Sequence, residues 1–194
     1  EPPVYIHCPP VMKDAHQKLS KRNGDASYQD LVAKGYLSEA VLNYLLLLGW
    51  SPEGEKEIFS LREMIDEWDP QRISKSPAIF DPLKLSHINF EYIKALSPEE
   101  FAEHAKPFME EYLPYIKDNG LLCKNLQPRT EVFGEIPEQI AFIKEMPDYN
   151  VELYVNKKMK TDPVSAKQSL EILLPLLKDI EEWTPDAIFA RCAQ

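Results

Sequence analysis

Lys18-Leu19-Ser20-Lys21-Arg22 is the stretch that says most about the fold. It follows a short β-branched run, Val4-Tyr5-Ile6-His7, and Gly24-Asp25 then marks a turn. Nucleotide-binding α/β domains hold their ligands at the ends of strands, and two lysines with a hydroxyl between them can meet a polyphosphate. The stretch therefore predicts a phosphate-binding loop beside a strand at residues 4–8. A solvated surface loop is the alternative, since short basic stretches are common.

Helix signals dominate the rest of the chain. Ser27 with Asp30, Ser60 with Glu63, and Ser97 with Glu100 have the spacing of capping boxes, in which serine and acid each bond the other's backbone. We expect a helix that begins at Ser27, a second helix with Ser38 as its cap, and others that begin at Ser60, after Phe80-Asp81-Pro82 and at Ser97. Further helices are expected around residues 137–144, 165–182 and 184–194, with an interruption or kink at Pro175. Strands are expected at residues 4–8 only, with short pieces near Ile58 and Ile73. The chain is predicted to be mainly α-helical.

Composition removes several classes of protein. The 194 residues carry a net charge of −10, which argues against non-specific binding to nucleic acid but leaves room for a local basic contact. No apolar run approaches the ~20 residues that span a membrane. Three scattered cysteines and four scattered histidines indicate neither a disulfide framework nor a metal site. A protein without metal, in a reducing cytosol, is expected.

A family likeness runs through the first hundred residues. It is carried by the basic pentapeptide and by the segments around it: Gly24-Asp25, Gly35-Tyr36-Leu37, Glu39-Ala40, Asn43-Tyr44-Leu45, Leu48-Gly49-Trp50, Phe80-Asp81-Pro82-Leu83-Lys84-Leu85, Asn89 and Tyr92-Ile93. Together these resemble bacterial-type glutamyl-tRNA synthetase, a class I aminoacyl-tRNA synthetase. The pentapeptide resembles the "KMSKS" loop of that class. Pro137-Glu138 and the helical pattern continue the likeness more loosely.

The resemblance implies a domain order. Residues 1–25 would be the last strand and KMSKS-type loop of a Rossmann-like catalytic domain, and residues 26–96 an α-rich stem-contact domain. Residues 97–160 would form a helical anticodon-binding subdomain, and residues 161–194 the truncated start of a second one. Helices in place of a β-barrel in this half favour the bacterial type of the enzyme. The chain is thus expected to be an internal or C-terminal fragment.

The resemblance also implies a chemistry. The family activates L-glutamate with ATP, which carries Mg²⁺, and transfers the glutamyl group to tRNA(Glu). By motif position Lys21 is the catalytic contact to the phosphates, because a placed lysine stabilises charge as pyrophosphate leaves. Lys18, Ser20 and Arg22 complete the ATP-binding set, and Leu19 anchors the loop. Arg129 is the candidate tRNA contact, with a plain surface arginine as the alternative.

Several expectations concern what surrounds this site. The family's "HIGH"-type motif and amino-acid pocket are not found in the chain, so the fragment should be inactive alone. A cytoplasmic monomer with no membrane contact is expected. The alternative is a non-catalytic tRNA-binding or protein-interaction module that keeps the loop. Ile73-Ser74-Lys75-Ser76-Pro77 repeats part of the motif, but we interpret it as a turn between helices.

Overall fold

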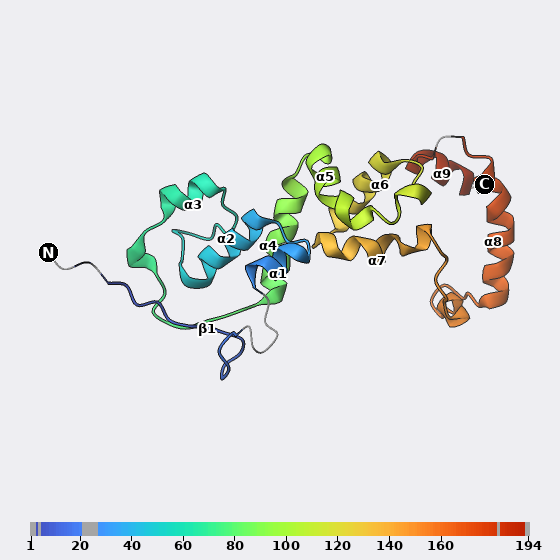
Figure 1. Ribbon diagram of the computed structural model, residues 1–194. Coiled ribbons are helices and arrows are strands. Elements are labelled where there is room, and N and C mark those ends of the chain that lie inside the picture. Colours follow the sequence, from blue (N-terminus) through green and yellow to red (C-terminus); the bar gives the residue numbers. More distant parts are fainter. Residues whose placement is uncertain (1–2, 4, 21–26, 182, 193–194) are drawn as a thin grey trace. The chain divides into compact units, whose positions relative to one another are not determined.

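The chain folds into two compact units, Glu1–Met146 and Pro147–Gln194. The computed structural model describes residues 3, 5–20, 27–181 and 183–192 (Figure 1). Helices make up most of both units, as the sequence predicts. None of the described helices is long and apolar enough to cross a membrane.

The first half of unit 1 is a group of four helices with a minimal sheet. Its elements are β1 (Val11–Met12), α1 (Tyr28–Ala33), α2 (Ser38–Gly49), α3 (Leu61–Glu67), the 3₁₀ turn η2 (Pro70–Arg72), β2 (Ala78–Ile79) and α4 (Pro82–Ala95). The capping boxes expected at Ser27 and Ser60 are both present, and the Asp81 carboxylate caps α4. These side chains bond backbone N–H groups that a helix start otherwise leaves without partners.

The second half of unit 1 continues the same body. It contains α5 (Pro98–Met109), η3 (Leu113–Tyr115), α6 (Asn119–Leu126), η4 (Gln127–Arg129), η5 (Phe133–Glu135), α7 (Ile136–Ile140) and η6 (Ala141–Ile143). The capping box at Ser97 is present, as expected. One hydrophobic core runs through both halves, from Leu31 in α1 to Ile140 in α7. A second, smaller core holds Trp50, Phe59 and Met64.

Unit 2 holds η7 (Val151–Tyr154), α8 (Pro163–Lys178) and α9 (Pro185–Cys192). Asp162 and Ser165 form a capping box at the start of α8. Pro175 lies inside this helix, which continues to Lys178, so of the interruption or kink expected there the interruption does not occur. The apolar side chains of α8 are at most partly buried, since the helix has no buried residue among those described.

The strand prediction was wrong in its position. Among the described residues of the 4–8 segment, Tyr5 and Ile6 are exposed and lie in no strand. The strand β1 comes later, after two prolines that cannot donate to a sheet, and it pairs in parallel with β2. Ile58 lies in no strand, and Ile73 forms only an isolated bridge with Trp50.

Two helix starts also differ from the prediction. Ser38 is the first residue of α2, and the cap position belongs to Leu37, whose side chain makes no capping bond. The Leu37 N–H donates instead to Asn89 Oδ1 in α4, at 2.8 Å. Helix α6 was not expected at all, although Asp118 caps it by accepting from the Leu121 N–H. A distant side chain thus replaces a local signal in the first case.

Candidate functional site

Residues 11–19 form a tight hairpin-like loop that leads into the basic pentapeptide. Met12 and Lys18 make an antiparallel bridge, and the Leu19 N–H donates to the Val11 carbonyl at 3.0 Å. At the tip, Asp14 Oδ1 accepts from the His16 and Gln17 N–H groups at 2.8 and 2.9 Å. An aspartate that bonds the backbone two residues on stabilises such turns. The loop therefore has a defined backbone up to Ser20.

The base of this loop is fastened to the start of α4. β1 lies beside β2 with Val11 opposite Ala78, and the Phe80 N–H donates to the Met12 carbonyl at 2.8 Å. The Asp81 N–H in turn donates to the Tyr44 hydroxyl at 2.7 Å, while the Tyr44 ring packs edge-on against Phe80. Helices α2 and α4 thus fix where the pentapeptide begins.

The predicted nucleotide residues fall partly within the described chain. Lys18 is exposed and follows directly from the bridge, and Ser20 is half-buried two residues on. Leu19 is half-buried between them, in keeping with an anchoring role. Lys21 and Arg22 lie outside the described residues. An exposed lysine beside a hydroxyl fits a polyphosphate, which takes point charges and hydrogen-bond donors.

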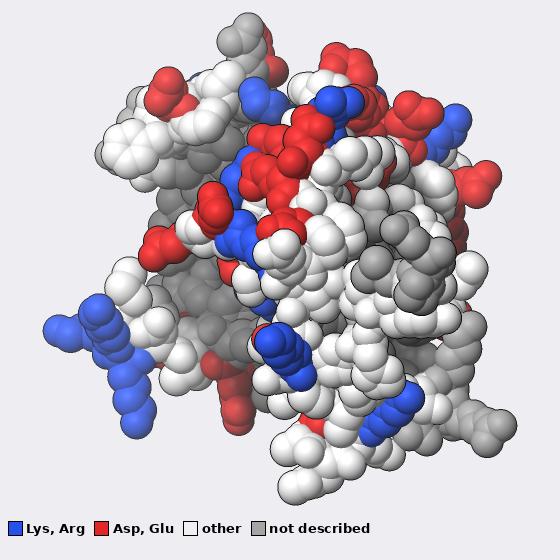
Figure 2. Space-filling model, turned by 90° about the vertical axis from the view of Figure 1, so that its left-hand side faces the viewer, with Lys and Arg blue, Asp and Glu red and all other residues white. Residues whose placement is uncertain are grey.

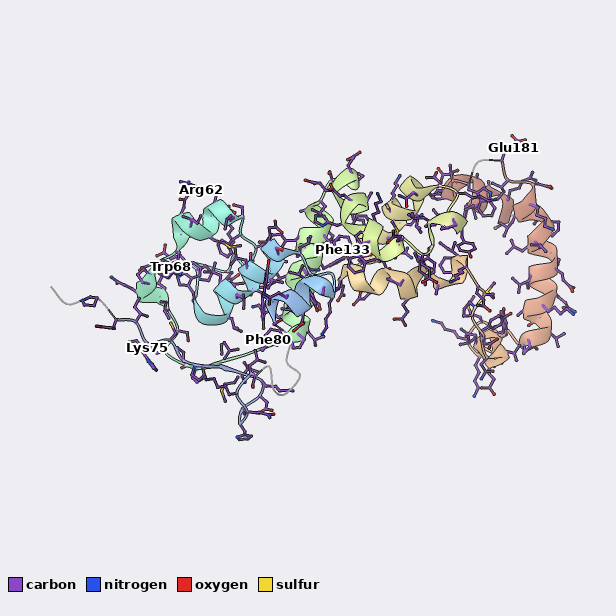
Figure 3. All side chains as sticks on the ribbon, viewed as in Figure 1. Arg62, Trp68, Lys75, Phe80, Phe133 and Glu181 are labelled. Atoms are coloured by element: carbon purple, nitrogen blue, oxygen red, sulfur yellow. The ribbon has the colours of Figure 1, made fainter. Side chains whose placement is uncertain are left out.

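The second serine–lysine stretch lies closer to this loop than the sequence suggested. Ser74 accepts through Oγ from the Ser76 N–H, and its own N–H donates to the Gly49 carbonyl at 2.9 Å. Lys75 is exposed on the connection that runs into β2, and Figure 3 shows it before Phe80 along that segment. Because β2 pairs with β1, this stretch is more than a turn between helices. The strand partner was missed because the paired residues, such as Val11 and Ala78, are 67 positions apart in the sequence.

Arg129 stands on a well-supported turn. It is exposed at the end of η4, which follows α6 without a break. Gln127 in the same turn donates through Nε2 to the Ile93 and Leu96 carbonyls, at 3.1 and 2.8 Å. Thr130 is fully buried and donates to the Leu126 carbonyl. In the described part of the chain, Arg129 makes no hydrogen bond or ion pair with Lys18, so the structure does not join these two candidate residues.

Two of the hollows in the described part of unit 1 are apolar and do not suit a phosphate, whereas a further one beside β2 is also lined by Asp81 and Lys84. The first apolar hollow lies beside β1 and is lined by Cys8, Pro9, Pro10, Val11, Leu45, Leu48, Gly49, Ile73, Ser76 and Ala78. The second lies between α2 and α3 and is lined by Leu42, Leu45, Leu46, Leu61, Met64, Ile65 and Trp68. On the face in Figure 2, most acidic side chains gather in the upper part with some basic ones among them, and further basic side chains lie below. Phosphate contacts at this site thus depend on individual loop residues.

The two tryptophans of this region differ. Trp50 is 3% exposed and donates from Nε1 to the Asp69 carbonyl, so it belongs to the core. Trp68, by contrast, is 47% exposed at the end of α3. In the described part of the chain, no group of three or more His, Cys, Asp and Glu side chains could hold a metal ion.

The sequence of this segment matches two known protein domains. Residues 1–87 match the catalytic domain of class I tRNA synthetases for E and Q, and residues 100–194 match an anticodon-binding domain. The glutamate–tRNA ligase of Clostridium acetobutylicum is 52% identical over 189 residues. The chain is a segment homologous to glutamate–tRNA ligases. The resemblance expected from the sequence is confirmed.

Further relatives set the extent of this family match. The C. acetobutylicum ligase alignment covers 96% of this chain and 39% of the relative, and a Clostridium botulinum glutamate–tRNA ligase is 51% identical over 98% of the chain, again with 39% of the relative. The chain therefore spans about two fifths of the length of these ligases. The structure of a glutamate tRNA ligase from Elizabethkingia meningosepticum, in complex with its amino acid, superposes with a TM-score of 0.74 at 23% identity, over 98% of this chain and 41% of that one. This supports the fold.

Proposed function

We propose that this segment supplies the ATP-phosphate loop and the tRNA-contacting helices of a glutamate–tRNA ligase. The observation that carries the proposal is the hairpin at residues 11–19, which presents Lys18 and Ser20 from a base fastened to α4, within a segment that matches the class I catalytic domain. The substrates are L-glutamate, ATP with its Mg²⁺, and tRNA(Glu).

Lys21 stabilises the negative charge that builds up when glutamate attacks the α-phosphate and pyrophosphate leaves. Lys18, Ser20 and Arg22 bind the phosphates on either side of it. The exposed Lys18 ammonium and the neighbouring Ser20 hydroxyl fit that ligand, and Mg²⁺ is carried by the phosphates of the nucleotide itself. What residues 11–19 contribute is position, because a charge placed in advance stabilises a transition state better than a mobile one.

The domain order proposed for the segment follows from the same assignment. Residues 1–25 end the Rossmann-like catalytic domain, residues 26–96 contact the tRNA stem, and residues 97–160 and 161–194 belong to two anticodon-binding subdomains. The matches at 1–87 and 100–194 support a change of role near residue 97. Arg129, exposed on the rigid η4 turn, contacts tRNA.

The segment does not activate glutamate by itself. Activation needs an amino-acid pocket and a "HIGH"-type motif, and the sequence of this segment carries neither. We further propose that the ligase acts as a cytoplasmic monomer.

Site-directed variants of a full-length ligase that carries this segment test the proposal. Pyrophosphate exchange is measured with glutamate, ATP and tRNA(Glu) all saturating, for Lys18→Ala and for Lys75→Ala. Lys18→Ala should slow exchange about tenfold or more, since one charge-assisted contact contributes roughly 1.5–3 kcal/mol and about 1.4 kcal/mol corresponds to tenfold in rate. Lys75→Ala should leave the rate unchanged. An effect of Lys75→Ala alone would assign the nucleotide to the other serine–lysine stretch. Equal effects of the two variants would assign it to neither stretch.

A further inference from the structure

Two backbone segments in unit 1 touch where any side chain would separate them. The Gly134 N–H donates to the Lys34 carbonyl at 3.1 Å, and the Phe133 N–H donates to the Gly35 carbonyl at 3.2 Å. A Cβ on Gly134 would stand 2.2 Å from the Lys34 oxygen, and one on Gly35 would stand 2.5 Å from the Gly134 nitrogen. Gly35 also has φ +94°, which favours glycine. We call this pairing the glycine contact.

A buried asparagine joins the same two segments. Asn89 in α4 is fully buried, and its Oδ1 accepts from the Leu37 N–H, just after the glycine contact on one side. Its Nδ2 donates at 2.6 Å to the Glu131 carbonyl, just before the contact on the other side. When a buried asparagine hydrogen-bonds one loop through its oxygen and another through its nitrogen, the two loops are held at one separation. Asn89 and the glycine contact therefore act together.

The two segments lie in stretches that match different domains. Residues 34–37 lie in the stretch that matches the catalytic domain, and residues 131–134 in the stretch that matches the anticodon-binding domain. Phe133, which is 2% exposed (Figure 3), belongs to one hydrophobic core with Leu31 and Leu37 of the first stretch. The junction of the two regions is thus closed by backbone hydrogen bonds as well as by packing.

Helix α4 extends this junction to the nucleotide loop. Phe80, just before the N-cap Asp81 of this helix, donates its N–H to Met12 in β1, and Asn89 in the middle of the helix bonds both sides of the glycine contact. At its end, the Ile93 carbonyl accepts from Gln127, two residues before Arg129. Helix α4 is therefore linked both to β1, at the base of the proposed ATP loop, and to the η4 turn that carries Arg129.

We propose that Gly134 and Asn89 are positioning residues for tRNA. They hold α5–α7 at one fixed orientation to α1–α4, so that a single tRNA is contacted by both regions at once. This rests on the proposed function. When two contact regions are rigidly joined, the second contact forms at a high effective concentration, and that gain is lost when the geometry no longer allows both. Neither residue needs to touch RNA.

The test compares two RNAs on a full-length ligase that carries this segment. Dissociation constants are measured for whole tRNA(Glu) and for its anticodon stem–loop alone, with Gly134→Ala and Asn89→Ala as variants. Gly49→Ala is the matched control, because a Cβ there meets nothing within 4 Å. Both variants should raise the dissociation constant for whole tRNA(Glu) about tenfold, while that for the stem–loop stays within about twofold of the parent value. The KM for tRNA in aminoacylation should rise equally, with kcat at saturating tRNA retained.

The outcomes separate this proposal from the one on which it rests. Equal losses for tRNA and stem–loop would mean that the variants damage the anticodon region itself, and no loss would mean that the junction does not position tRNA; either result overturns the proposal. Should Gly134→Ala fail to fold, as judged by circular dichroism, Asn89→Ala decides alone, since it adds no atom. A parent enzyme that binds neither RNA would overturn the proposed function as well.

Discussion

Replacing Asn43 by alanine tests how the smaller core of unit 1 is held. Asn43 is fully buried in α2, and its Oδ1 accepts from the Phe59 N–H at 2.8 Å and from the Tyr92 hydroxyl at 2.9 Å. Its Nδ2 donates to the Glu57 carbonyl at 2.8 Å. The residue therefore attaches the loop before α3 to α2 and α4 with three hydrogen bonds.

The cost of Asn43→Ala follows from the groups that it leaves behind. The Phe59 N–H is buried and loses this acceptor, which costs about 1–3 kcal/mol. The Tyr92 hydroxyl keeps the Phe59 carbonyl, and the exposed Glu57 segment can turn to water, so these two losses are smaller. Alanine returns about 0.5 kcal/mol through its helix propensity. We expect unit 1 to lose about 2–4 kcal/mol of unfolding free energy.

Urea unfolding followed by tryptophan fluorescence measures this loss. A Trp183→Phe background leaves the two remaining tryptophans, Trp50 and Trp68, both in unit 1. Asn125→Ala is the matched control, because Asn125 is exposed and donates a single bond to the Leu121 carbonyl; its effect should stay within about 0.5 kcal/mol. If Asn43→Ala unfolds at the same urea concentration as the control, the network does not stabilise the fold.

Three shorter predictions concern charge, capping and RNA. The pKa of Glu63 is lowered from 4.5 to about 2, first by its hydrogen bond to the Lys56 ammonium and then by Ser60. The stability that ionised Glu63 contributes is therefore complete above pH 4.5 and is lost as the pH falls to 2. The urea midpoint of Glu63→Gln should therefore fall less across that range than that of the parent, and parallel plots of midpoint against pH would contradict this. Ser97→Ala should cost about 1 kcal/mol by removing the cap of α5, and an unchanged urea midpoint would show that the cap is dispensable. The 194-residue chain, with net charge −10, should bind tRNA(Glu) no better than about 1 μM and more weakly as salt rises, whereas tight, salt-insensitive binding in a fluorescence titration would favour an interaction module that uses apolar contacts.

Local signals explain which elements the sequence predicted correctly. The capping boxes at Ser27, Ser60 and Ser97 need only a pair of residues three positions apart, and all three are present. The cap of α2 was assigned to Ser38, whereas the cap position belongs to Leu37, whose N–H is satisfied by Asn89 in α4, 52 residues away. Such a partner leaves no trace in the neighbouring sequence.

The same limit applies to the candidate site. The pattern of Lys18 and Ser20 could be read directly, but the strand beside them was placed at residues 4–8, because β1 is defined by its pairing with β2 and not by its own two residues. The role of Gly134 could not be predicted either, since glycine is required there by the Lys34 carbonyl that approaches it. In both cases a contact distant in sequence decides the structure.

Pyrophosphate exchange by Lys21→Ala, in a full-length ligase that carries this segment, tests the central claim most directly. The rate is measured against ATP concentration, with glutamate and tRNA(Glu) saturating. If Lys21 contacts the phosphates chiefly in the transition state, kcat should fall by at least ~10²-fold, equivalent to about 2.7 kcal/mol, with little change in the KM for ATP. A kcat equal to that of the unmodified enzyme would remove Lys21 from the reaction and contradict the assignment of the basic loop.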